Sequence, residues 1–362
     1  FLIFQVFSSH SIVNYFIKEI VGKYRMLDLN LIQKYDSQKI YQTYDKWPEI
    51  AKSCFEENFS KLDISNIDHI VFAGMGGSGT IGDIISSILS KTDIHVSVVK
   101  GYLLPKTVDA NTLVVTTSVS GNTDETLRVL QYSTTTKAKF IAFSSGGKLE
   151  EFSQKNGIQH VEISQLHSPR ASLTKYLYSI LNVLENILPI NRIDTLESIS
   201  MLENTRKEIY SSRLDEKNPS ISLAKWIINT PIVYYPWGLQ SAAIRFKNSL
   251  QENSKIHVIT EDVIESCHNG IVSWQKSKDI QPILIRGKDD YIKTKERWEI
   301  LKEFFEKNNI DYYEIVSNKG NVLSKIINLI YLLDYTSIYH AILNKTDPTP
   351  VDAINFVKER LK

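Results

Sequence analysis

The sequence contains few residues of the kinds that mark specialised protein classes. Its 362 residues include only two cysteines, Cys54 and Cys267, too few for a disulfide framework or a zinc cluster. Net charge is also small, because 42 Lys and Arg residues stand against 41 Asp and Glu residues. Such a chain has no overall field to attract nucleic acid or an anionic membrane surface. Few cysteines are typical of a reducing compartment, so we expect a cytoplasmic protein.

Two common catalytic motifs are absent as well. The sequence has no G-x-x-x-x-G-K-[ST] pattern for a nucleoside triphosphate and no H-E-x-x-H pair of metal ligands. We therefore expect neither a metal nor a nucleotide at the functional site. The composition is that of a globular protein, with 42% hydrophobic and 23% charged residues, and the length is sufficient for two domains.

The first 25 residues differ from the sequence that follows. They are rich in aromatic residues and precede a methionine, Met26. The apolar run at residues 1–7 follows no basic region, precedes no small-residue cleavage site and is too short to span a membrane. We interpret residues 1–25 as an N-terminal extension rather than a targeting segment.

Short apolar segments alternate with amphipathic ones along the rest of the chain. Strands are expected at residues 67–74, 94–99, 112–118, 139–145 and 160–163 and, after a polar stretch at 188–198, at 231–236, 282–287 and 312–317. Segments between them, such as residues 294–309, have apolar residues at helical spacing. This alternation predicts an α/β protein of two doubly wound parallel-sheet domains flanked by helices, at residues 26–190 and 191–362.

A glycine-rich turn follows the first expected strand, in the segment VFAGMGGSGTIGD at residues 71–83. Its glycines let the backbone turn tightly and approach a ligand. Gly74, Gly76 and Gly79 satisfy the dinucleotide pattern G-x-G-x-x-G, but the next strand ends at Lys100 rather than at an acidic ribose-binding residue. The match alone is therefore weak evidence for nicotinamide binding.

A second turn, TTSVSGNTDET at residues 116–126, carries several hydroxyl groups at the end of another strand. Ser118, Ser120 and Thr123 can donate hydrogen bonds, while turn amides and a helix N-terminus point into the same space. Ser78 on the glycine turn can join them across adjacent strand ends. These groups predict a receptor for a phosphate monoester. The alternative is an ordinary helix N-cap formed by Thr123.

The order strand, GMGGSG, strand, SVSGNTDET resembles the sugar isomerase (SIS) domain, a module that binds phosphosugars and has an S-x-S-G-x-T turn. The resemblance extends downstream to the bifunctional phosphoglucose/phosphomannose isomerases, which are built from two such domains. It covers nearly the whole chain from Met26. It implies interconversion of glucose 6-phosphate and mannose 6-phosphate with fructose 6-phosphate, no cofactor, a homodimer, and a substrate-binding loop at Gly76 and Gly77.

The resemblance also implies an arginine and a base. Arg170, in the segment HSPRASLT, would stabilise a developing enediolate oxygen. Glu252 matches the catalytic glutamate of an R-x-K-x-x-x-x-E-N pattern formed by Arg245, Lys247, Glu252 and Asn253, and would move a proton between C1 and C2. From the residues alone, Arg170 could be a surface residue and Glu252 a solvated charge on an amphipathic helix at residues 241–255.

Two further groups are implied to assist opening of the sugar ring. His268 lies in an H-N motif, but Cys267 and Gly270 stand where the family commonly has Asn and Glu. These departures could change the partner and orientation of His268. Lys358 occupies the lysine position of a closing I-x-x-L-K pattern on an expected C-terminal helix, with Lys362 as a nearby competitor.

Two rival functions fit parts of the sequence. SIS domains also occur in phosphosugar-binding regulators, but the chain has neither a basic recognition helix nor excess positive charge. Another sugar-phosphate isomerase, or an amino-sugar phosphate isomerase or synthase, is the second alternative. A synthase of that kind would need ammonia or glutamine chemistry, for which the sequence has no N-terminal cysteine nucleophile.

Overall fold

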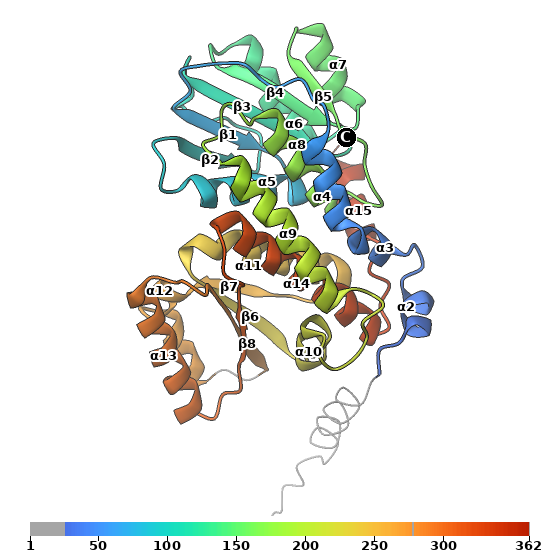
Figure 1. The fold of residues 1–362 in the computed structure, drawn as a ribbon, viewed down its shortest axis with the longest axis vertical. Coiled ribbons are helices and arrows are strands. Elements are labelled where there is room, and N and C mark those ends of the chain that lie inside the picture. The colour runs from blue at the N-terminus through green and yellow to red at the C-terminus, as the bar shows by residue number, and fades with distance from the viewer. Residues whose placement is uncertain (1–25, 277–278, 362) are drawn as a thin grey trace, which may run out of the picture.

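The computed structural model describes residues 26–276 and 279–361. The segment interpreted as an N-terminal extension, residues 1–25, lies outside these ranges, as does Lys362. Figure 1 shows two α/β domains, one above the other, with helices α9 (Arg192–Ile209), α11 (Gln240–Ser249) and α14 (Val322–Leu343) lying between their sheets. This arrangement buries one face of each sheet in a common core.

The first sheet is parallel throughout, with the strand order β2-β1-β3-β4-β5. Its strands are β1 (His69–Ala73), β2 (His95–Val99), β3 (Thr112–Ser118), β4 (Lys139–Ser144) and β5 (Gln159–Glu162). Alternate residues point to opposite faces: Ile70 and Phe72 join the common core, whereas Val71 and Ala73 join a second cluster. Helices α4 (Trp47–Glu56), α5 (Gly76–Leu89) and α8 (Leu173–Val183) contribute to the common core, and α6 (Asp124–Gln131) and α7 (Gly147–Lys155) cover the other face.

The second sheet is also parallel and has the order β7-β6-β8-β9. Its strands are β6 (Thr230–Tyr235), β7 (Ile259–Asp262), β8 (Ile280–Arg286) and β9 (Tyr313–Val316). Helices α11 (Gln240–Ser249) and α14 (Val322–Leu343) pack into the common core, and α12 (Val263–Ser266) and α13 (Ile292–Lys307) cover the other face. The predicted fold class is confirmed, while the boundary between residues 190 and 191 stays a prediction.

Helix α14 is the central helix of the common core. Within the described ranges it alone has the length and composition to cross a membrane, with a mean hydropathy of 1.3, but 94% of that window is buried inside the fold. The rings of Tyr331, Tyr335 and Tyr339 follow one another along it. Tyr331 donates a hydrogen bond to the Tyr44 carbonyl at 2.6 Å, so α14 also anchors the N-terminal helices.

The remaining elements are the long helix α9 between the sheets and a set of shorter helices and helical turns. They are α2 (Leu29–Tyr35), α3 (Ile40–Asp45), η1 (Tyr132–Thr134), η2 (Arg170–Ser172), α9 (Arg192–Ile209), α10 (Pro219–Trp226), η3 (Trp237–Leu239), η4 (Leu250–Ser254), η5 (Gly270–Gln275) and α15 (Asp352–Arg360). The last of these is the C-terminal helix predicted from the sequence. A linker at residues 344–351 joins it to α14 and is called the C-terminal linker below.

Candidate active site

The glycine turn packs tightly against the end of a neighbouring strand. A Cβ atom at Gly74 would lie 2.9 Å from the Cβ of Ser78 and 2.9 Å from the carbonyl oxygen of Thr117. Real side chains do not approach this closely, so only glycine fits. The contact places Ser78 beside the end of β3, as predicted from the two turns.

The hydroxyl turn holds its side chains close together. The hydroxyls of Ser118 and Thr123 are hydrogen-bonded at 2.8 Å, and the Ser120 hydroxyl accepts from the Asn122 amide at 3.3 Å. Thr123 is the N-cap residue of α6, but its side chain makes no capping hydrogen bond. The capping alternative therefore does not describe how this hydroxyl is used. The Ser78 hydroxyl makes no hydrogen bond with the described residues.

A third turn, between β4 and α7, packs directly against the hydroxyl turn. Gly121 has a φ of 66°, and a Cβ atom there would lie 1.7 Å from the carbonyl oxygen of Gly146. The Ser145 hydroxyl donates to the Val119 carbonyl at 2.6 Å. The position of the hydroxyl groups is thus fixed by the adjacent strand, which the sequence analysis did not include in the site.

The glycine turn also reaches Arg170. A Cβ atom at Gly77 would lie 3.7 Å from the Cα of Arg170 and 3.4 Å from Nη1 of Arg245. Gly76, with a φ of 53°, starts helix α5 in a conformation that favours glycine. Of the two residues predicted to form a substrate-binding loop, Gly77 therefore lies against an arginine pair, whereas no atom lies within 4 Å of the Cβ position at Gly76.

Arg170 is buried, with 5% of its surface exposed, so it is not the surface residue that the sequence left open. Its Nε donates to Oδ1 of Asn253 at 2.8 Å, and its Nη1 to Oε2 of Glu252 at 3.3 Å. Its Nη2 donates to the carbonyls of Pro348 at 2.7 Å and Thr349 at 3.1 Å. One guanidinium thus joins the first domain, the second domain and the C-terminal linker.

A π-helical turn brings Glu252 to this arginine. The predicted helix at residues 241–255 is α-helical to Ser249 and continues as the π-turn η4. It ends at Lys255, which has a φ of 60°. A π-turn accommodates one extra residue in a helix and is frequent at functional sites. Both Glu252 and Asn253 consequently contact the guanidinium of Arg170.

A buried ion pair lies beneath Arg170. Arg245 on α11 donates through Nη2 to Oδ2 of Asp334 on α14 at 2.7 Å and to the backbone carbonyl of Arg170 at 2.7 Å. Oδ1 of Asp334 also accepts from the Ser249 hydroxyl at 2.6 Å. Burial acts to lower the pKa of Arg245, but Asp334, Tyr44 and Glu252 together raise the pKa above its usual value. A fixed, permanently positive group therefore supports the loop of Arg170.

The C-terminal linker is held from several directions. Lys255 donates through Nζ to the Glu252 carbonyl and, at 3.3 Å, to the Pro348 carbonyl. Ser37 donates to Oδ2 of Asp347 at 2.5 Å. Burial lowers the pKa of Lys255, and the positive charge of Arg170 lowers it further. The sequence analysis missed Lys255 and the linker, because carbonyl contacts leave no signature in side-chain patterns.

Lys358 and His268 are placed apart from this cluster. Lys358 lies on α15, which has no buried residue, and its side chain forms no ion pair or hydrogen bond with the described residues. His268 is exposed and directly follows α12 and Cys267. Figure 1 shows α12 and α15 on opposite sides of the molecule. Because Glu252 precedes β7 and His268 follows it, the two residues lie toward opposite ends of the second sheet.

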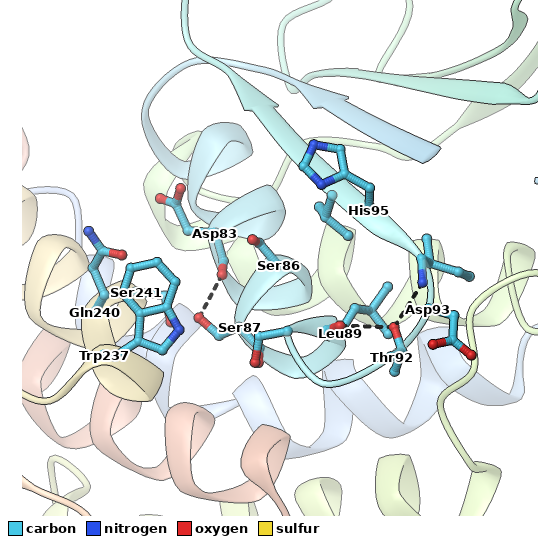
Figure 2. Close-up of a pocket in the computed structure, with 13 residues that line it drawn as sticks. Asp83, Ser86, Ser87, Leu89, Thr92, Asp93, His95, Trp237, Gln240 and Ser241 are labelled. Carbon is cyan, nitrogen blue, oxygen red and sulfur yellow. Dashed lines mark hydrogen bonds between the residues drawn. The ribbon is translucent and has the colours of Figure 1, made fainter. Parts of the chain in front are cut away.

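A separate cavity of about 460 Å³ lies between the domains. Figure 2 shows Asp83 and Ser87 of α5 on one side, and Trp237 and Gln240 on the other. It adjoins the end of α5 remote from Gly76 and the start of α11, whereas Glu252 follows the end of α11. The cavity therefore does not include the Arg170 cluster.

In the described ranges, no group of three or more His, Cys, Asp and Glu side chains has the arrangement of a metal site. The cations at the candidate active site are those of the chain itself, Arg170, Arg245 and Lys255.

Two SIS-like sheets, with Arg170 and the half-buried Glu252 in contact between them, define the class as a two-domain SIS protein. Residues 63–156 match the family described as SIS domain, and residues 216–361 match that described as Bacterial phospho-glucose isomerase C-terminal SIS domain. The chain is 32% identical over 334 residues to a bifunctional phosphoglucose/phosphomannose isomerase of Caldicellulosiruptor bescii, covering 89% of this chain and 98% of the relative. It belongs to the bifunctional phosphoglucose/phosphomannose isomerase family, as the sequence resemblance predicted.

Two further comparisons agree with this result. An Aquifex aeolicus protein of the same name is 30% identical over 323 residues, covering 88% of this chain and 94% of that relative. Among solved structures, the C-terminal domain of glucosamine-fructose-6-phosphate aminotransferase from Francisella tularensis superimposes with a TM-score of 0.64 at 17% identity. That superposition covers 85% of this chain and 96% of the other, and it supports the fold alone.

Proposed function

We propose that this chain is an aldose–ketose isomerase that interconverts glucose 6-phosphate and mannose 6-phosphate with fructose 6-phosphate. The observation that carries the proposal is the contact of 3.3 Å between Glu252 and Arg170, beside the glycine turn and between the two domains. A carboxylate next to a fixed guanidinium suits a reaction in which a proton moves while negative charge develops on a neighbouring oxygen. Family membership supports the same activity.

The substrate phosphate binds at the ends of β1 and β3 in this proposal. Ser78, Ser118, Ser120 and Thr123 supply hydroxyl groups, and the start of α6 supplies backbone amides. Hydroxyls and amides are uncharged hydrogen-bond donors. They bind a phosphate monoester without a permanent positive charge in the site, so the phosphosugar can be released after each turnover. Gly76 and Gly77 leave room for the sugar to extend from this site toward Arg170.

Glu252 is the proton carrier. Its carboxylate removes the proton from C2 of an open-chain aldose phosphate, giving a cis-enediol intermediate, and returns that proton to C1 of the ketose. Arg170 stabilises the negative oxygen that develops during the transfer. Because the hydrogen moves as a proton and a carbonyl changes place with a hydroxyl, the reaction balances without a redox cofactor or a metal.

Ring opening is assigned to His268 and Lys358. In this proposal His268 transfers a proton at the ring oxygen, and Lys358 stabilises the negative charge that develops as the ring opens. Since His268 lies on the side of the protomer opposite α15, we propose a homodimer in which His268 of one protomer serves the site of the other. The proposed location of the protein is the cytoplasm.

The first test is NMR of fructose 6-phosphate incubated with the purified protein and a chelator. Appearance of both glucose 6-phosphate and mannose 6-phosphate is the expected result. Activity that disappears with chelator and returns with a divalent metal would contradict the metal-independent mechanism. Neither product, with phosphosugar binding still measurable, would indicate a sensor instead.

A further inference from the structure

One carboxylate of the second domain has no assigned role. Glu261 on β7 pairs in register with Tyr234 on β6, so both side chains point to the same face of the sheet. On that face Tyr234 packs with Val263 and Trp274. Oε2 of Glu261 is buried there and has no hydrogen-bond partner among the described residues. A buried, unpartnered carboxylate oxygen is costly and calls for an explanation.

The carboxylate of Glu261 fills the space beside Gly270. A Cβ atom at Gly270 would lie 2.5 Å from Oε2, 3.0 Å from Oε1 and 3.0 Å from Cδ of Glu261. The backbone of Gly270 is not in the left-handed region, so its conformation would accept a side chain. Glycine is therefore required here by the position of Glu261 rather than by the turn.

This contact lies beneath the turn that carries His268. The turn has hydrogen bonds of its own: the His268 amide donates to the Glu265 carbonyl at 2.9 Å, and Asn269 Nδ2 donates to Oε1 of the exposed Glu265 at 2.7 Å. Glu261 is the charged group that contacts the turn from the core side. Position 270 is also one of the two places where the motif around His268 departs from the expected pattern.

We propose that Glu261 is a positioning residue for His268. Its carboxylate, delivered from β7 into the space left by Gly270, fixes the path of residues 267–270 and with it the direction of the imidazole. This inference rests on the proposed role of His268 in ring opening. Displacement of a catalytic group by about 1 Å lowers a rate by up to about a hundredfold, so loss of the carboxylate is expected to slow ring opening.

Ring opening can be measured separately from isomerisation in a Glu252→Gln background, where proton transfer between C1 and C2 is blocked. The readout is the enzyme-dependent exchange between the α and β anomers of glucose 6-phosphate, followed by NMR. Adding Glu261→Ala is expected to slow this exchange about ten- to a hundredfold. Glu265→Gln, which alters an exposed carboxylate of the same turn, is the matched control and is expected to leave it unchanged.

Moving the carboxylate from position 261 to position 270 tests whether the carboxylate itself positions His268 or whether Glu261 only stabilises the fold. Two carbon–carbon bonds separate Cβ from Cδ in a glutamate, about 2.5 Å, close to the 3.0 Å between the Gly270 Cβ position and Cδ of Glu261. Gly270→Glu alone places two carboxylates in one space and is expected to slow exchange. Glu261→Ala combined with Gly270→Glu is expected to recover at least about tenfold of the rate lost in Glu261→Ala.

The outcomes separate this inference from the proposed function. If His268→Ala slows anomer exchange and Glu261→Ala does not, Glu261 has no positioning role. A folded double variant that recovers no activity over Glu261→Ala would also overturn the inference, because the carboxylate would then not be the active feature. If His268→Ala leaves exchange at the wild-type rate, the assigned role of His268 fails, and the role of Glu261 fails with it.

Discussion

Arg170 forms side-chain hydrogen bonds with Asn253, Pro348 and Thr349 at 2.7–3.1 Å, and a longer contact with Glu252 at 3.3 Å. The shorter bonds fix the guanidinium in place. The longer one leaves the carboxylate of Glu252 free to exchange Arg170 for a substrate proton. At the scale of single residues, the proposed site therefore pairs a firmly bound cation, Arg170, with a more loosely bound carboxylate, Glu252, which is the proposed base.

Glu252→Gln is expected to lower kcat by about 10²–10⁴-fold, because an amide cannot accept the C2 proton. Binding of glucose 6-phosphate should change only a few-fold, since the proposed phosphate contacts are all in the first domain. Steady-state kinetics and calorimetric titration measure the two effects. Glu203→Gln removes an exposed carboxylate on α9 and is the control. Wild-type kcat in Glu252→Gln would place the base elsewhere.

Gly121→Ala tests the support of the hydroxyl turn. The new Cβ atom would lie 1.7 Å from the Gly146 carbonyl oxygen, at a φ of 66°. We expect the free energy of unfolding to fall by more than about 2 kcal/mol and KM for the phosphosugar to rise. Gly157→Ala has a similar φ of 65° with no atom within 4 Å, so it should cost only about 1 kcal/mol. Equal losses in urea unfolding would contradict the proposed contact with Gly146.

The residue types in the sequence were sufficient to predict much of the candidate site, but not which residues contact one another there. The hydroxyls of Ser118 and Thr123 were predictable because the turn concentrates donors at a strand end, and they do meet. Arg170 and Glu252 were assigned through family resemblance, and the structure brings them into contact. The pairing of Arg245 with Asp334 was not predictable, because it joins residues 89 positions apart and no local pattern encodes that distance.

Helix α15 and the linker before it have opposite properties. The linker is bound by Arg170 through two carbonyls, whereas α15 has no buried residue. Removal of residues 352–362 should therefore change the midpoint of thermal unfolding by no more than a few degrees, yet abolish turnover if Lys358 acts in the site. Lys358→Met should reproduce the loss of activity and Arg360→Met should not. Full turnover in the truncated chain would exclude Lys358 from the mechanism.

His340, near the end of α14, makes the fold sensitive to acid. Burial lowers its pKa to about 4, and Nδ1 has no hydrogen-bond partner among the described residues. The unfolded chain binds this proton at a pKa of about 6.5, so the stability contributed by neutral His340 is complete above pH 6.5 and is lost as pH falls toward 4. The loss amounts to about 3 kcal/mol.

Urea unfolding of the wild type at pH 7 and pH 5, compared with His340→Leu, measures this effect. The wild type should lose more stability between the two values than the variant does. Equal losses in the two proteins would show that other groups cause the acid sensitivity.

Elements with strong apolar patterns were predicted well, and weakly patterned ones were not. The eight strands expected from the sequence are all present, but β7 was missed. Its four residues, Ile259–Asp262, form an edge strand without a fully buried position, so no alternation marks it. The π-turn at Leu250–Ser254 was missed for another reason. Its amphipathic spacing differs from that of an α-helix by a single residue, and it contacts Arg170, which is distant in the sequence.

For the whole molecule, the separation of His268 from Glu252 leads to a test of the proposed dimer. Protomers carrying Glu252→Gln and protomers carrying His268→Ala should each be nearly inactive alone. Random reassociation makes about half of the dimers mixed, and each mixed dimer has one site with both residues intact. Unfolding and refolding an equal mixture should therefore restore about a quarter of wild-type activity. A mixture that stays inactive would place both residues in one protomer's site.

The bond from Arg245 to the Arg170 carbonyl also limits how the protein can open. Rotating the two domains apart would break this buried bond and leave both partners without water, at a cost of about 1–3 kcal/mol for each unsatisfied group. The C-terminal linker, by contrast, contacts Arg170 through the carbonyls of Pro348 and Thr349, and water can replace these two acceptors when the linker moves. We therefore expect substrate and product to pass beside a moving linker while the two domains travel as one rigid body, so that the slow motion in each turnover belongs to residues 344–351.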